Sequence, residues 1–93
     1  MRWSVAIEAE GDRVVTREEV VELADAVAAS DGVATGIAAF RYGARLIVRA
    51  DSRDEAVTNA TREFQQAVAR AGLPAFPIVR TEAAGEDEDG DEG

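Results

Sequence analysis

Hydrophobic and polar residues alternate along the first ten positions of the chain. One set of alternate residues is apolar and comprises Trp3, Val5, Ile7 and Ala9. The other set comprises Arg2, Ser4, Ala6 and Glu8. Because successive side chains of a β-strand point to opposite faces, a period of two is typical of a half-buried strand. We therefore predict a strand over residues 2–10, with the apolar set facing the core.

A helical spacing replaces this alternation in residues 16–30. Thr16 and Glu19 form a capping-box pattern, in which each side chain accepts a hydrogen bond from the backbone N–H of the other residue. Apolar residues then recur three and four positions apart, at Val20, Leu23, Ala24 and Val27. This spacing gives a helix one apolar stripe. Gly32 follows closely and is predicted to end the helix.

A second helix is predicted within residues 52–74. Ser52 and Glu55 repeat the capping-box pattern at its start. Its apolar stripe consists of Ala56, Val57, Ala60, Phe64, Ala67, Val68 and Ala71. Gly72 and Pro74 predict its end, because glycine readily adopts a left-handed conformation and proline cannot continue a helix.

Three further strands are predicted, over residues 33–40, 44–50 and 75–82. The glycine-containing segment 41–43 separates the first two, so we expect a hairpin with its turn there. The last strand contains Pro77, whose backbone nitrogen cannot donate to a neighbouring strand. It is therefore expected at an edge of the sheet.

The predicted order is strand, helix, strand, strand, helix, strand. Right-handed crossovers in the two halves give an α+β fold, in which two helices cover one face of a four-stranded antiparallel sheet. This order resembles the ferredoxin-like βαββαβ domains, among them the ACT-type modules. The resemblance covers about residues 2–81, and it implies a fold more than a function. We expect one domain, residues 1–81, followed by an acidic disordered tail, residues 82–93.

The net charge of −9 is concentrated near the carboxyl end of the chain. Seven of the 19 acidic residues follow Arg80, and no basic residue does. The preceding part contains 12 acidic residues and all ten arginines, which is a net charge of −2. The predicted domain itself is therefore nearly neutral. The acidic tail has too few apolar residues to offset the entropy lost on ordering.

Several kinds of chemistry are not expected from this composition. The chain has no cysteine and no histidine, so it lacks thiolate nucleophiles, thiolate metal sites and the usual general base near neutral pH. We predict no catalytic residues, no metal site and no cofactor, and we expect the protein not to be an enzyme. No apolar run approaches the roughly 18 residues of a membrane span, and no secretory leader is recognisable, so we expect a cytoplasmic location.

The segment from Phe40 to Ala50, FRYGARLIVRA, invites comparison with RNA-binding strands, which combine arginines with stacking aromatic rings. If Leu46 and Val48 face the helices, the opposite face carries no ring. A nearly neutral domain also attracts phosphate poorly. We therefore expect no binding to nucleic acid.

The sheet face away from the helices is the leading candidate for function. It is predicted to carry Ser4, Ala6, Glu8, Arg45, Ile47 and Arg49. Small residues, an isoleucine and charges of both signs suit a protein contact, so we expect a homodimer or a complex with another protein. A solvated antiparallel face is the alternative.

The loop at Gly11, Asp12 and Arg13 supports a second hypothesis. ACT-type modules bind amino acids, often beside a glycine in the first strand–helix loop, and Asp12 can accept a hydrogen bond from an ammonium group. The resemblance thus implies a possible amino-acid-sensing module. A plain turn is the simpler explanation, because both glycine and aspartate are favoured in turns.

Overall fold

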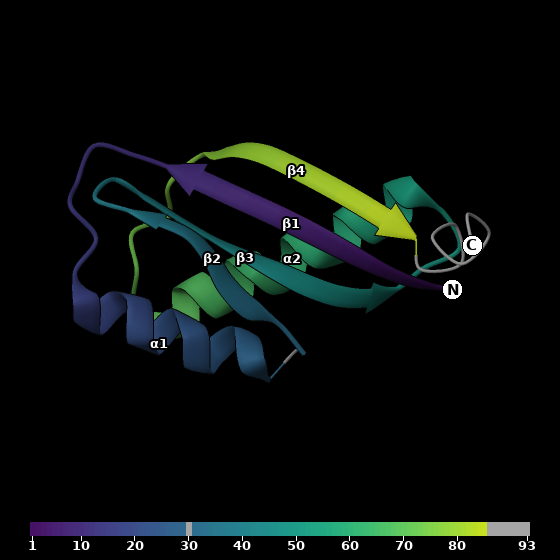
Figure 1. The fold of residues 1–93 in the computed structure, drawn as a ribbon, viewed down its shortest axis with the longest axis horizontal. Coiled ribbons are helices and arrows are strands. Elements are labelled where there is room, and N and C mark those ends of the chain that lie inside the picture. The colour runs from purple at the N-terminus through teal and green to yellow at the C-terminus, as the bar shows by residue number, and fades with distance from the viewer. Residues whose placement is uncertain (30, 86–93) are drawn as a thin grey trace.

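The computed structural model describes residues 1–29 and 31–85. Its elements are β1 (Arg2–Glu10), α1 (Arg17–Ala28), β2 (Val33–Ala38), β3 (Arg41–Arg49), α2 (Arg53–Ala71) and β4 (Ile78–Gly85). The four strands form one antiparallel sheet in the order β2-β3-β1-β4. This confirms the predicted α+β, ferredoxin-like arrangement. Figure 1 shows that β1 begins, and β3 and β4 end, at the same end of the sheet.

The core lies between the sheet and the two helices. The apolar set of β1 is buried, as predicted, and so are the alternate residues Tyr42, Ala44, Leu46 and Val48 of β3. Helix α1 packs beside β2 and β3, whereas α2 lies against β1, β3 and β4 (Figure 1). At the end of the core, the indole Nε1 of Trp3 donates a hydrogen bond to the carbonyl of Ala50 at 3.2 Å. The core is therefore one layer thick and covers one sheet face.

Side chains cap the starts of both helices. The predicted capping box is complete at α1 and half formed at α2. At α1, both reciprocal bonds between Thr16 and Glu19 are present. At α2, Ser52 accepts from the backbone of Glu55. The Glu55 carboxylate instead accepts from the backbone N–H of Asp51, at 2.7 Å. The second motif thus caps the helix, but its glutamate accepts from the residue before the N-cap instead of from the N-cap itself.

The helix ends follow different rules. Gly72 ends α2 in a left-handed conformation, with φ of 78°, as predicted. At the end of α1 it is Asp31, with φ of 57°, that takes the left-handed conformation. Gly32 serves a different need, because a Cβ atom there would lie 2.5 Å from the Leu46 side chain. Because residue 32 has no side chain, the backbone there can pack closely on β3.

The predicted hairpin turn at residues 41–43 is wrong by two residues. The turn lies at residues 39–40, and 41–43 belong to β3. Tyr42 is consequently a core residue. A Cβ atom at Gly43 would lie 2.5 Å from the carbonyl oxygen of Ile7, so this glycine permits close approach of two strands. A glycine inside a strand often marks such an approach, and its presence alone does not distinguish this case from a turn.

Strand β4 lies at an edge of the sheet, as its proline predicts, but its limits differ from the prediction. It begins at Ile78, after Pro77, and it continues to Gly85. Residues 82–85 pair with β1, so the domain boundary predicted at residue 81 is too early. The rest of the predicted tail, 86–93, lies outside the described residues.

Candidate functional site

One face of the sheet is not covered by either helix. The six residues predicted for this face, Ser4, Ala6, Glu8, Arg45, Ile47 and Arg49, occupy the alternate positions between the buried residues of β1 and β3. Arg45 and Arg49 are exposed, and the other four are partly buried by their neighbours. These six residues, together with Gly43, Arg80 and Glu82, are called the open sheet face below.

Strand register arranges the centre of the open sheet face in two rows. Across β3, β1 and β4 the rows are Arg45, Ala6 and Glu82, and then Gly43, Glu8 and Arg80. The face predicted from sequence includes no residue of the last strand, and the pairing with β1 adds Arg80 and Glu82 to it. A hollow of about 210 Å³ lies here and is lined by both arginines, both glutamates and Ala6, together with Thr35 of β2. We call Glu8, Arg45, Arg80 and Glu82 the charge quartet.

The charge quartet is electrically balanced. An Nη2 atom of Arg80 lies 2.8 Å from Oε2 of Glu82. This hydrogen bond, and the charge of Arg80, hold the pKa of Glu82 below its usual range, and Arg45 acts in the same direction. The same hydrogen bond to Glu82 raises the pKa of Arg80, and the negative charge of Glu8 raises it further. The Arg80–Glu82 pair is therefore ionised at neutral pH, and it is too exposed to stabilise the fold much.

The predicted ligand loop is divided by the structure. Arg13 turns toward α1, where it forms an ion pair with Glu19 at 2.5 Å. The hydrogen bond to Arg13 is the main cause that lowers the pKa of Glu19. Gly11 and Asp12 instead border a shallow groove, across from residues 74–77. The loop thus brings two of its three predicted residues to one surface and directs the third away.

Tyr42 joins the segment before β4 to the core. Its hydroxyl donates to the carbonyl of Pro74 at 2.5 Å and accepts from the backbone N–H of Phe76 at 3.2 Å. Its ring stacks on Phe76, with centroids 5.4 Å apart, and contacts Phe64 at 5.8 Å. Burial raises the pKa of the Tyr42 hydroxyl. The period of two in β3, extended back from Ala44, was the sequence signal that could have identified Tyr42 as a core residue.

Comparison with known proteins finds no matching family model, no similar curated protein and no similar solved structure. Within residues 1–29 and 31–85, no cluster of three or more metal-ligating side chains is present. Neither helix in this part of the chain has the length and apolar character to cross a membrane. Function must therefore be inferred from the surfaces themselves.

Proposed function

We propose that this protein is a non-enzymatic domain that acts through protein–protein contact, as a homodimer formed by two open sheet faces. The observation that carries the proposal is the charge quartet. Two arginines and two glutamates surround small side chains on a face that neither helix covers. The balanced quartet offers no net attraction for a polyanion, whereas it can complement a copy of itself.

The two central rows are complementary under two-fold symmetry. Consider an axis between two stacked sheets that runs perpendicular to the strands and passes between the rows. Each row then faces the other row of the second copy, so Glu82 faces the partner's Arg80. Arg45 lies over the partner's Gly43, where no side chain obstructs it, beside the partner's Glu8. Symmetry forms every contact twice.

Burial of this face would change the energetics of its charges. Exposed ion pairs contribute little because water screens them. Between two sheets the same pairs lose water but gain a second set of opposite charges, and Ile47 and Ala6 add apolar contact. Charge complementarity of this kind also sets the register of a contact and disfavours wrong partners. Association would in turn stabilise a thin-cored domain by mass action.

A charge placed at Ile47 tests the proposal. Ile47→Arg adds a guanidinium that lies opposite the partner's Arg41 in the two-fold arrangement and beside Arg45 and Arg49 of its own strand, so we expect the dimer dissociation constant to rise about tenfold or more, which corresponds to about 1.4 kcal/mol. Size-exclusion chromatography with light scattering measures the change. Val21→Arg is the matched control, because Val21 is an exposed aliphatic residue on α1. Equal dissociation constants for the two variants would exclude the open sheet face as the interface.

A second candidate function is an amino-acid-sensing module similar to ACT domains. It is favoured by the shallow groove that Gly11 and Asp12 line, where the Asp12 carboxylate could bind an ammonium group. The neighbouring Glu10 carboxylate lies 3.7 Å from the guanidinium of Arg41. We expect a panel of free amino acids to raise the melting temperature if this function is correct, and Asp12→Asn to abolish the rise. The absence of any shift at millimolar concentrations would reject it.

A further inference from the structure

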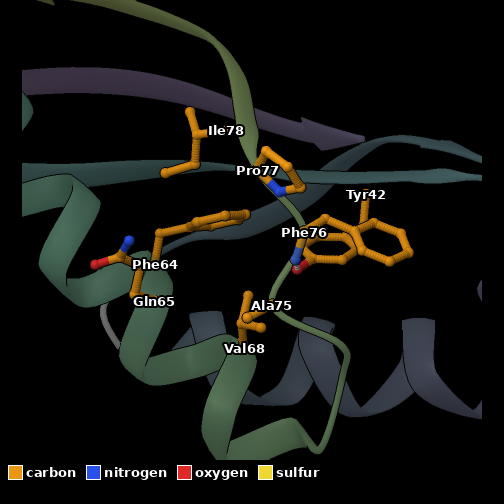
Figure 2. Close-up of a pocket in the computed structure, with 8 residues that line it drawn as sticks. All are labelled: Tyr42, Phe64, Gln65, Val68, Ala75, Phe76, Pro77 and Ile78. Carbon is orange, nitrogen blue, oxygen red and sulfur yellow. Dashed lines mark hydrogen bonds between the residues drawn. The ribbon is translucent and has the colours of Figure 1, made fainter. Parts of the chain in front are cut away.

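A pocket of about 370 Å³ lies between α2 and the segment that leads into β4 (Figure 2). Its walls include three aromatic and three aliphatic side chains, Tyr42, Phe64, Phe76, Val68, Ala75 and Ile78. Three of the five aromatic residues in the chain are gathered here. This aromatic pocket shares no residue with the open sheet face, and it has no part in the proposed dimer.

The aromatic pocket has a buried floor and an exposed mouth. Tyr42, Phe64 and Val68 are buried, whereas Gln65 and Ala75 are exposed. Figure 2 shows the Phe64 ring directed from α2 toward the stacked rings of Tyr42 and Phe76. A sealed, empty apolar space of this size would be very unfavourable in a small domain, because cavity cost rises with volume. An open mouth allows the space to be occupied from outside.

The wall opposite α2 is held in place rather than free to collapse. The Tyr42 hydroxyl bonds the backbone of both Pro74 and Phe76. Further along, the carbonyl of Pro77 accepts a hydrogen bond from the backbone of Glu10 at 3.1 Å. The two prolines also restrict the backbone of this segment. The pocket is therefore preformed, which lowers the entropy cost of binding.

The lining determines what could bind. It contains no charged side chain, and the Tyr42 hydroxyl already has a donor and an acceptor, which leaves the amide of Gln65 at the mouth. An ionic ligand would lose its hydration without gaining a counter-charge. The volume lies near the lower end of the roughly 300–1,000 Å³ of small-molecule sites. Aromatic walls favour offset or edge-on contact with another ring.

We propose that the aromatic pocket binds a neutral aromatic molecule of one ring that carries a single hydrogen-bonding group. The ring lies among Phe64, Phe76 and Ile78, and the polar group lies at the mouth beside Gln65. A carboxamide or a hydroxyl satisfies this description, whereas a carboxylate of the same shape does not.

Benzamide and benzoate form a matched pair of probes, because they differ mainly in charge. Methyl NMR spectra of the full chain are recorded during titration with each compound. We expect benzamide to shift the methyl signals of Val68 and Ile78 saturably while Leu23, on α1, stays unchanged. Benzoate should bind at least about tenfold more weakly. No saturable shift with benzamide, or equal binding of benzoate, would overturn the proposal.

A substitution at the mouth tests the location. Ala75→Leu is expected to obstruct the pocket and to weaken benzamide binding at least about tenfold. Ala69→Leu is the matched control, because Ala69 is an exposed alanine near the end of α2 that does not line the pocket. Both substitutions are at exposed positions, so both variants should fold. Unchanged binding by Ala75→Leu, or equal loss in both variants, would place the ligand elsewhere and contradict the inference.

Discussion

Mixing Arg80→Glu chains with Glu82→Arg chains is expected to restore the dimerisation that is weakened in each variant alone. In the proposed two-fold arrangement, residue 80 of one copy faces residue 82 of the other. Arg80→Glu therefore opposes glutamate with glutamate at two symmetric places, and Glu82→Arg opposes arginine with arginine. Because like charges across an interface cost several kcal/mol, we expect each variant to associate about 100-fold more weakly than the wild type.

Sedimentation velocity on each variant and on their equimolar mixture measures this effect. In the mixture, glutamates at 80 and 82 of one chain face arginines of the other, so a heterodimer should form at wild-type concentrations. The doubly exchanged chain, Arg80→Glu with Glu82→Arg, should self-associate like the wild type. Arg70→Glu, at an exposed position on α2, is the control for net charge. If no heterodimer forms in the mixture, residues 80 and 82 do not face each other across the interface, and the proposed arrangement is contradicted even if the wild type is dimeric.

Phe64→Ala is expected to reduce the free energy of unfolding by about 3–5 kcal/mol, the usual range for removal of a buried phenylalanine. Phe64 is 1% exposed and contacts the ring of Tyr42. The core has only one layer, so few neighbours can move into the space. For a domain of this size, such a loss lowers the melting temperature by about 12 °C or more.

Urea denaturation of the wild type and of Phe64→Ala measures this loss, with Gln65→Ala as the control. Gln65 is the next residue of α2 and is exposed, so its replacement should change the unfolding free energy by less than about 0.5 kcal/mol. A cost below about 1 kcal/mol for Phe64→Ala would mean that the aromatic cluster does not support the fold as described. Both variants should be compared at one protein concentration, because dimerisation adds to apparent stability.

The elements that could be predicted from sequence are those with an uninterrupted period. Strand β1 alternates over its whole length, and the α2 stripe is bounded by Ser52 and Gly72, so local rules determined both. Their pairing into one sheet then followed from the handedness of the crossovers. The six residues predicted for the open sheet face occupy that face for the same reason.

The errors arose where one residue type serves two purposes. The sequence pattern predicts a turn at Gly43, but the glycine is needed because β1 and β3 approach closely there. That error moved Tyr42 out of the predicted core and concealed the aromatic pocket. Acidic composition similarly predicts a tail from residue 82 onward, although pairing with Ala6 of β1 makes Glu82 part of the sheet. Such contacts depend on residues distant in sequence, which local patterns do not report.

Sedimentation equilibrium of the wild-type chain, over a concentration series from low to high micromolar, tests the central claim most directly. The account predicts reversible association to a species of twice the chain mass of 9.9 kDa, with no larger assembly. Ile47→Arg, which opposes arginine with the partner's Arg41, should shift this equilibrium toward the monomer. A single species of 9.9 kDa at every concentration would contradict the proposal that the open sheet face is a dimer interface.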